Sequence, residues 1–511
     1  FTVNIGSSAS ATVLFRPAGD VTSLINFSST GNVLSITGAD YITFDGRPGG
    51  TGSNQYLKFT TTSSTLGAIV INNNSTNNSF LYCQFKGSTT AASTGVFTSG
   101  TTLNSPLTID HCDIDASGVA NTCFYSGGGI PDLSITNSNF YNFRNGYGIY
   151  VFTGSTNAIV DNNNIYQTTS YNGFAGTTTG IYFVGITNGR VSNNNIGGSG
   201  PGLTGTWTVT NVTPAAYNFT GINATSLTTS KVYGNKIQNF DWQCTACTWT
   251  GISTGGTSGS VGTDGANYIG TGTGTENIKI TSASGATQVN GITNIGAITV
   301  ENNFIGGIRT FTTTASAGTS FTGISATGSA SGAVNNNLVG SLTTPLSINL
   351  AAQSATGNAQ NVYGILINAG GVLSITNNTI ANLNNGSTVT SGVTRGIVNS
   401  TTGGNLTIAN NTIFAISTSQ PVIATGSAAS LDGITVSTNA NPLTISGNTI
   451  YDLSNSAASA AVVVNGITHA STTSVNNKIE RNLIHSLKTA SGTSVQNGIN
   501  IANGICTVQN N

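Results

Sequence analysis

The sequence predicts an all-β fold, a parallel β-helix (β-solenoid) of about 15 coils, and three observations predict it. First, a short motif recurs along most of the 511 residues: a β-branched apolar residue, a variable position, two polar positions that are often Asn-Asn, a variable position and Ile. Second, a Gly-Ile pair recurs between the copies of this motif. Third, short runs of Val, Ile, Thr and Phe alternate with polar residues between Gly, Asn and Ser turns, which favours strands.

The first residues of the chain do not follow the motif. Residues 1–30 contain the apolar stretches Val13–Phe15 and Leu24–Phe27, which we interpret as strands of an atypical first rung, because terminal repeats of solenoids usually differ from the rest. Leu34–Gly46 then alternates apolar and polar residues and ends in a turn pattern. The parallel β-helix is therefore expected to span residues 31–511.

The motif is most regular from Ile375 to Ile380. Degraded copies come earlier, at Phe80–Phe85, Ile109–Ile114 and Ile135–Phe140, and Val261–Ile269 is a weak copy. The clear copies are Val160–Ile165, Val191–Ile196, Val232–Ile237, Val300–Ile305, Val334–Val339, Ile408–Ile413, Ile445–Ile450 and Ile479–Ile484.

The spacing of the two patterns predicts where the coils vary in length. From Gly-Ile to the next Asn-Asn is roughly 9–13 residues, whereas the return to the next Gly-Ile is roughly 19–31 residues, so one coil has about 30–41 residues. We therefore expect loop insertions on one side of the solenoid. The Gly-Ile glycines are Gly148, Gly180, Gly221, Gly251, Gly291, Gly323, Gly364, Gly396, Gly433, Gly466 and Gly498.

The two polar positions of the motif differ in how freely they vary. The first is Gly in Gly234-Asn235 and Arg in Arg481-Asn482, while the second stays Asn. An Arg favours solvent, so the second position is expected to point inward, where stacked Asn side chains can satisfy turn amides. The predicted structural ladder is Asn163, Asn194, Asn235, Asn303, Asn337, Asn378, Asn411, Asn448 and Asn482.

Composition excludes several classes of function. Charged residues make up 6% of the chain and the net charge is -1, which argues against a nucleic-acid partner. No apolar run has the ~18 residues of a membrane span, so we expect no membrane insertion. Six cysteines in a chain rich in Thr, Asn and Gly favour an exported protein.

Acidic residues gather at only one place. Asp110, Asp113 and Asp115 lie beside His111, and Asp113 and Asp115 would share one face of a strand. A cation site there is weighed against an ordinary exposed turn and strand edge, which we favour. Glycosidases need a converging carboxylate pair, and the signatures of polygalacturonases are missing from the sequence. We predict no catalytic residues, metal or cofactor; an enzyme of this fold would be a polysaccharide lyase or glycoside hydrolase.

Large aromatic residues lie in the long return segments of three consecutive coils. Stacking of the coils would bring them to one side of the solenoid. One interpretation is a ligand-binding patch for carbohydrate or a protein partner, because Trp and Tyr dominate interface hot spots. The alternative, which we favour, is that these segments fold over the solenoid and bury their aromatics. The residues are Trp207, Trp242, Trp249, Tyr171 and Phe174.

Two pairs of cysteines are candidate disulfides. Cys244 and Cys247 form a CxxC sequence, for which a local disulfide or free thiols are expected rather than a zinc site. Cys83 and Cys112 occupy equivalent motif positions on neighbouring coils. They would be within reach of each other if the coils stack, either as a disulfide or as two stacked thiols.

The end of the sequence and the repeats together suggest the biological context. Val508–Asn511 matches Val300–Asn303 and stops before the expected Ile, so we expect the chain to be truncated in mid-coil and to belong to a longer polypeptide. Leu34–Gly46, the Gly-Ile steps and the Asn-Asn motifs resemble the right-handed β-helix repeats of large secreted bacterial proteins. Those use the type IX secretion route and include adhesins of species with gliding motility. The resemblance implies a secreted or cell-surface location.

Three functions are consistent with these patterns. The first is a non-catalytic adhesive or structural rod that contacts surface glycans or other cell-surface proteins. The second is a polysaccharide-binding or polysaccharide-degrading β-helix protein. The third is an exported cargo bound to secretion or surface machinery. The motifs are specific for the fold and carry little information on activity, because β-helices host many functions.

Overall fold

The computed structural model is a right-handed parallel β-helix, as the sequence predicts. It describes residues 2–3, 8–89, 95–118, 121–173, 175–210, 216–283, 285–312, 318–328, 332–351, 359–371, 373–400, 404–437, 442–458, 460–472 and 476–511. Almost all of its regular elements are short strands, and each coil contributes strands to three parallel sheets. Three short 3-10 turns are described, η1 (Pro48–Gly50), η2 (Pro201–Leu203) and η3 (Gly426–Ala428).

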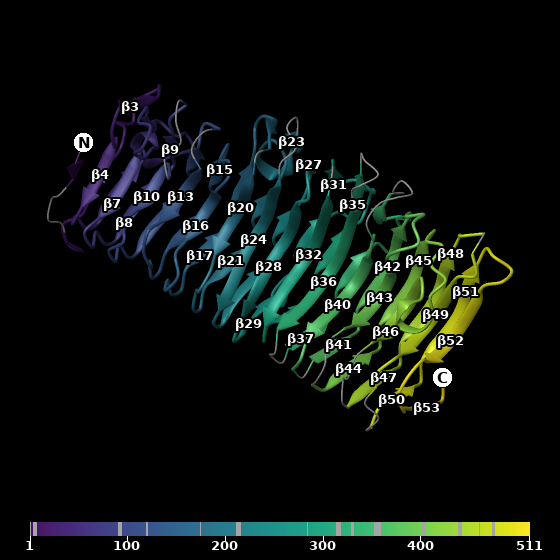
Figure 1. Ribbon diagram of the computed structural model, residues 1–511. Coiled ribbons are helices and arrows are strands. Elements are labelled where there is room, and N and C mark those ends of the chain that lie inside the picture. The colour runs from purple at the N-terminus through teal and green to yellow at the C-terminus, as the bar shows by residue number, and fades with distance from the viewer. Residues whose placement is uncertain are drawn as a thin grey trace. The chain divides into compact units, whose positions relative to one another are not determined.

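The chain divides into two compact units. Unit 1 comprises residues 1–170, 176–208 and 220–239, and unit 2 comprises residues 171–175, 209–219 and 240–511. In each unit, neighbouring strands of a sheet come from successive coils and run parallel (Figure 1). The described part of residues 1–30 supplies one strand to each sheet, since β1, β2 and β3 pair in parallel with β4, β5 and β6.

The first sheet carries the Gly-Ile steps. Its strands are β1 (Thr2–Val3), β4 (Leu34–Thr37), β7 (Ile69–Asn72), β10 (Phe97–Ser99), β13 (Thr122–Ser126), β16 (Tyr147–Val151), β20 (Gly176–Phe183), β24 (Tyr217–Leu227), β28 (Thr248–Gly256), β32 (Ala286–Gly296), β36 (Gly318–Gly328), β40 (Val362–Ala369), β43 (Thr394–Asn399), β46 (Leu431–Val436), β49 (Val463–His469) and β52 (Val495–Ile501).

The second sheet carries the apolar residue that opens each Asn-Asn motif. Its strands are β2 (Val13–Phe15), β5 (Ile42–Asp45), β8 (Asn78–Leu81), β11 (Leu107–Asp110), β14 (Ser134–Thr136), β17 (Ile159–Asp161), β21 (Arg190–Ser192), β25 (Ser230–Tyr233), β29 (Gly259–Val261), β33 (Thr299–Glu301), β37 (Gly332–Asn335), β41 (Leu373–Thr376), β44 (Leu406–Ala409), β47 (Leu443–Ser446), β50 (Lys478–Glu480) and β53 (Thr507–Gln509).

The third sheet carries the Ile that closes the motif. Its strands are β3 (Ile25–Ser29), β6 (Leu57–Thr61), β9 (Cys83–Lys86), β12 (Asp113–Asp115), β15 (Asn139–Tyr141), β18 (Asn164–Tyr166), β19 (Tyr171–Asn172), β22 (Asn195–Ile196), β23 (Trp207–Thr210), β26 (Lys236–Ile237), β27 (Phe240–Cys244), β30 (Tyr268–Gly270), β31 (Ile278–Ser282), β34 (Phe304–Gly306), β35 (Ile308–Thr312), β38 (Leu338–Gly340), β39 (Ile348–Leu350), β42 (Thr379–Asn385), β45 (Thr412–Thr418), β48 (Thr449–Asn455) and β51 (Leu483–Thr489).

The two apolar ends of the motif build the core. In unit 2, Ile375 pairs in register with Val334 and Ile408, and all three side chains are fully buried. Ile380 lies in the corresponding column of the third sheet and is also fully buried. Because side chains alternate across a strand, each motif places one apolar residue inward on either side of the turn. Burying these columns supplies the hydrophobic stabilisation of the solenoid.

The Gly-Ile step has a steric cause. A Cβ atom on Gly364 would lie 2.5 Å from the carbonyl oxygen of Gly396 on the next coil and 2.7 Å from Cγ2 of Ile380. Gly148 in unit 1 is equally restricted, since its Cβ would lie 2.6 Å from the oxygen of Gly180. The glycines therefore form a column at which successive coils approach closely, and the following Ile packs in the core.

The return segments are more ordered than simple loop insertions. In unit 2, β27, β31, β35 and β39 lie in these segments, and each pairs in parallel with the next. In later coils the two strands of the third sheet merge, so that β42 pairs with both β38 and β39. The extra length of a return is thus used for a further stacked strand.

Candidate functional site

The inward turn position is occupied by a continuous column of amides in unit 2. The Oδ1 atom of Asn378 accepts hydrogen bonds from the backbone N–H and the Nδ2 of Asn337, both at 3.0 Å. Its own Nδ2 donates to the carbonyl of Val334 at 2.8 Å and to Oδ1 of Asn411 at 3.0 Å. The same pattern joins Asn303, Asn337, Asn411, Asn448 and Asn482, which are at most 3% exposed.

The outward turn position explains why Asn and Gly precede the ladder residue. Asn377 has a φ of 57° and Gly447 a φ of 65°, both in the left-handed region. Glycine adopts this region without steric cost, and asparagine enters it more readily than other residues do. Arg481, with a φ of 56°, shows that the position accepts other side chains because it faces outward.

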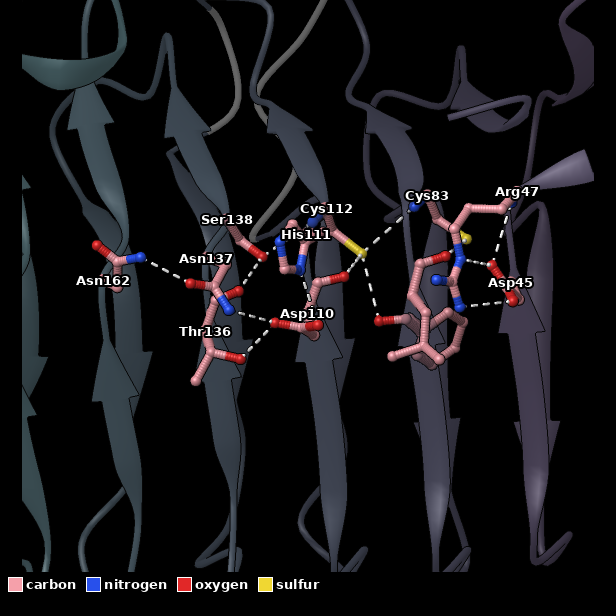
Figure 2. Close-up of polar contacts among 12 residues, drawn as sticks. Asp45, Arg47, Cys83, Asp110, His111, Cys112, Thr136, Asn137, Ser138 and Asn162 are labelled. Atoms are coloured by element: carbon pink, nitrogen blue, oxygen red, sulfur yellow. Dashed lines mark hydrogen bonds and ion pairs between the residues drawn. The ribbon is translucent and has the colours of Figure 1, made fainter. Parts of the chain in front are cut away.

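In unit 1 the ladder begins with other residue types. Asn163, Asn194 and Asn235 are fully buried and continue the amide pattern. They are preceded by Ser138 and Cys112: the Ser138 hydroxyl accepts the Cys112 N–H at 2.9 Å. The preceding coils place Cys83 and Cys112 in the same column, and the Cys112 sulfur accepts the Cys83 N–H at 3.5 Å (Figure 2).

The candidate disulfides have different outcomes. Cys244 and Cys247 form a disulfide, and both residues are buried. Cys83 and Cys112 are free, buried thiols stacked on neighbouring coils. Burial raises the pKa of Cys83, and the neighbouring Cys112 adds to that increase. The Cys83 thiol is therefore protonated and unreactive, since thiol chemistry requires the thiolate.

The ligand-binding interpretation of the three tryptophans is wrong, because all three are fully buried. Trp207 packs edge-on against Phe143 in unit 1. In unit 2, Trp242 stacks on Tyr217 with ring centroids 5.0 Å apart, and its indole N–H donates to the Tyr217 carbonyl at 2.9 Å. Trp207 and Trp242 belong to strands whose side chains alternate between core and solvent, and the alternation turns them inward. Trp249 belongs to β28, which is buried over most of its length.

Tyr171 cannot serve as a binding platform either. It is 5% exposed, and its hydroxyl lies 3.1 Å from the hydroxyl of Tyr217 inside unit 2. Phe174 lies outside the described residues. The favoured alternative, burial of the aromatics, thus holds for the four described residues, although Trp249 is buried on β28 of the first sheet and not on a return segment.

The acidic cluster of unit 1 is part of a polar chain along the turns (Figure 2). The carboxylate of Asp110 accepts hydrogen bonds from Thr136 at 2.6 Å and Asn137 at 2.8 Å, and lies 2.8 Å from Nδ1 of His111. The His111 ring stacks on Tyr82 at 4.5 Å, and the Arg47 guanidinium covers the Tyr82 ring at 4.4 Å. The hydrogen bonds from Thr136 and Asn137 join neighbouring coils, whereas the contact between Asp110 and His111 lies within one turn.

The carboxylates in this row of polar contacts are neutralised by hydrogen-bond donors and arginine side chains. Burial alone would raise the pKa of Asp110, but the hydrogen bonds from Thr136, Asn137 and His111 outweigh it and hold the pKa below its ordinary value. Asp45 likewise has a lowered pKa, because Arg47 and Arg16 bind its buried carboxylate against the cost of desolvation. Carboxylates held in this way stabilise turns and are poorly placed to exchange protons.

Asp113 and Asp115 face outward on β12 but have different partners. Burial and the charge of Asp115 raise the pKa of Asp113, although Asn139 donates a hydrogen bond to it at 2.7 Å. Asp115 accepts the Ser117 N–H at 2.7 Å and the Asn142 amide at 3.0 Å. Within the described residues, no group of three or more His, Cys, Asp or Glu side chains is arranged to hold a metal ion.

Unit 2 contains an ion pair that the sequence did not reveal. Nε of Arg395 lies 3.1 Å from Oδ2 of Asp432, and both side chains are at most 1% exposed. The Arg395 Nη2 donates to the carbonyls of Ser427 and Ala429, so the segment around η3 covers the pair. Burial raises the pKa of Asp432. The pair thus joins β43 to β46 within the first sheet, and the other hydrogen bonds of Arg395 fasten the segment around η3 to them.

A solvent-facing group of tyrosines on the first sheet of unit 1 was also missed. Tyr125, Tyr150 and Tyr182 occupy matched positions on β13, β16 and β20. Their rings stack with centroids 4.8 Å and 4.5 Å apart, and Tyr147 packs edge-on against Tyr150. The sequence carries a visible pattern, because a tyrosine directly follows the buried Phe124, Ile149 or Ile181 on three successive coils.

Comparisons with known proteins add no family assignment. No protein-family model matches the chain, and no curated protein matches it. Among the described residues, no helix is long and apolar enough to cross a membrane.

Proposed function

We propose that this chain is the repeat region of a secreted or cell-surface protein and acts as a non-catalytic adhesive or structural rod. The observation that supports it best is that the inward and outward faces of each strand carry different side chains. The inward face holds apolar columns and the amide ladder, whereas the outward face carries ordered rows of polar and aromatic side chains. A repeating outer surface on a rigid core suits multivalent attachment, in which many weak contacts add up.

The electrostatics also support this role. Acids whose pKa is lowered, such as Asp45 and Asp110, are bound to Arg or to amide and hydroxyl donors. A glycosidase requires two carboxyl groups that converge on one sugar and have separated pKa values. The outward position of Asp113 and Asp115 on one short strand, each engaged by backbone or amide donors, does not provide such a pair.

Adhesion can be measured directly. Beads coated with the chain should resist detachment by flow from polysaccharide-coated and bacterial surfaces better than beads coated with an inert protein of similar size. The same preparation should release no reducing ends or unsaturated sugars from a panel of polysaccharides. Detachment at the same shear as the inert control would contradict the adhesive role, and sustained sugar release would favour the enzymatic alternative.

A further inference from the structure

The tyrosine face of unit 1 is the outward surface formed by Tyr125, Tyr147, Tyr150 and Tyr182. Strand alternation creates it: each of Phe124, Ile149 and Ile181 is fully buried, so the residue that follows must face solvent. The four tyrosines are partly exposed. They come from three successive strands of one sheet, β13, β16 and β20, which lie side by side in Figure 1.

The rings are held in a fixed arrangement. Tyr150 and Tyr182 are nearly parallel, with an interplanar angle of 4°, while Tyr147 is inclined by 68° to Tyr150 and by 70° to Tyr182. The column therefore presents ring edges and hydroxyl groups, and Tyr147 adds a ring in a different plane. Aromatic groups that are fixed before binding lose little conformational entropy when a ligand arrives.

A hollow of about 320 Å³ adjoins this face. It is lined by residues of two neighbouring coils, and each of them is uncharged: Asn121, Thr122, Tyr125, Asn145, Gly146 and Tyr147. Its volume is at the lower end of the range for small-molecule sites, about 300–1,000 Å³. Aromatic walls with a few amide and hydroxyl groups are the usual composition of such sites.

The lining of the hollow is anchored to the backbone. The backbone carbonyl of Asn121 accepts the Tyr147 N–H at 3.0 Å. The side-chain Oδ1 of Asn145 accepts the Thr177 N–H, also at 3.0 Å. A Cβ atom on Gly146 would lie 2.1 Å from the Asn121 oxygen, so glycine is required for this close approach. The hollow is thus formed by the stacking of the coils.

We propose that the tyrosine face and its hollow bind a neutral polysaccharide, with one sugar in the hollow against Tyr147 and the chain running along the column. Sugar rings combine an apolar C–H face, which can pack on the inclined ring of Tyr147, with hydroxyl groups, which can pair with the amides of the hollow and the phenols of the column. The uncharged lining provides no partner for an ionised ligand, and burying an unpaired charge is costly. This favours neutral glycans over uronate or sulfated ones. The inference names the ligand for the proposed adhesive function and rests on it.

Binding should be measured by titration calorimetry on the full chain with neutral glucose and mannose hexasaccharides. Tyr147→Ala should weaken binding by about tenfold or more, because removing a central aromatic anchor costs more than 1 kcal/mol. Tyr147→Phe keeps the ring and should retain most of the affinity. Tyr268→Ala is the matched control, since Tyr268 is 42% exposed on the third sheet of unit 2 and should change affinity by less than about twofold.

Several results would overturn the inference. Unchanged binding in a folded Tyr147→Ala variant would place the site elsewhere, and so would a loss as large in Tyr268→Ala. If Tyr147→Ala does not fold, the Tyr147→Phe variant provides the test. A folded Tyr147→Phe variant that loses about tenfold in affinity would contradict the role of the Tyr147 ring. Binding only to polygalacturonate, or only to a cell-surface protein, would refute the neutral-glycan assignment. In that last case the coated beads would still adhere, so adhesion would stand without this ligand.

Discussion

The inward turn position is filled differently in the two units, although the coils pair in the same way. In unit 2 each amide of the ladder donates and accepts, so that Asn378 has four hydrogen bonds to other coils. At the start of unit 1, the Cys112 thiol makes only weak sulfur contacts: it accepts the Cys83 N–H at 3.5 Å and donates to the Phe80 carbonyl at 3.4 Å. The parallel register of β8 with β11 is nevertheless regular. The glycine step begins only at Gly148, so apolar packing is sufficient for stacking in these first coils, and the amides add stability to it.

The glycine column is common to both units, and breaking it should give the largest effect. Gly364→Ala would force its Cβ against the Gly396 oxygen, and Gly148→Ala would do the same at Gly180. Overpacking typically costs about 1–3 kcal/mol. We expect both variants to lose about 3 kcal/mol in the free energy of unfolding, measured in urea.

Gly498 provides the control for this prediction. A Cβ atom there meets nothing within 4 Å, so Gly498→Ala should be neutral or stabilise the chain by up to about 1 kcal/mol. A loss as large as that of Gly364→Ala would mean that strand propensity, and not the close approach of coils, explains the Gly-Ile step.

The ladder should show the difference between the units. Asn378→Ala removes the buried acceptor of the Asn337 N–H and the buried donor to the Val334 carbonyl, and we expect a loss of about 2–3 kcal/mol. Cys112→Ala removes a weak acceptor and a small volume, for an expected loss of about 1 kcal/mol. Chemical denaturation of both variants gives the comparison.

The neighbouring turn position is the control. Asn377→Gly changes the outward residue, whose φ of 57° suits glycine, so stability should change by less than about 0.5 kcal/mol. Equal losses in Asn378→Ala and Asn377→Gly would show that the turn backbone, and not the buried amide, carries the stabilisation.

Placing an asparagine at the Ser138 position extends the Asn ladder of unit 1 and tests whether the amide adds stability there. The Ser138 hydroxyl already accepts the Cys112 N–H. In the column of inward turn residues, Ser138 is next to Asn163, whose Oδ1 accepts the Ser138 N–H. In Ser138→Asn the new amide can donate to the Asn163 oxygen as well, and we expect a gain of about 1 kcal/mol in thermal or urea unfolding. A destabilised variant would show that this part of unit 1 has no room for the amide.

The acids beside this column should give the smallest effect, and it depends on pH. The lowered pKa of Asp110 means that its ionised form stabilises the fold above the unfolded pKa of about 3.9, and this contribution disappears as pH falls through the folded pKa. The raised pKa of Asp113 means that its ionised form weakens the fold at neutral pH. Asp110→Asn should therefore lower, and Asp113→Asn raise, stability at about pH 7.

Both differences from the wild type should shrink as pH falls towards about 3, because Asp113 becomes protonated in the folded chain and the contribution of Asp110 begins to disappear below the unfolded pKa of about 3.9. Urea midpoints at the two pH values provide the measurement. Differences that stay constant with pH would show that shape and hydrogen bonding, and not ionisation, separate the two positions.

The repeat pattern was sufficient to predict the fold because it records contacts that recur on every coil. The identity of Asn378 and its variable neighbour Asn377 distinguished the inward from the outward turn position. The ligand-binding interpretation of the Trp residues failed although burial was the favoured alternative, because their place in long segments gave no indication that those segments form strands with an inward face. The tyrosine face was overlooked because Tyr125, Tyr150 and Tyr182 become neighbours only when the coils are aligned through their Gly-Ile steps.

A double-mutant cycle along the ladder tests most directly that successive motifs lie above one another. Asn337 and Asn378 contact each other, whereas Asn337 and Asn448 belong to the same column without a direct hydrogen bond between them. With serine substitutions, we predict a coupling energy on the order of 1 kcal/mol for the first pair and less than about 0.5 kcal/mol for the second. Equal coupling in the two pairs, or none in the first, would contradict the stacked-column description of this protein.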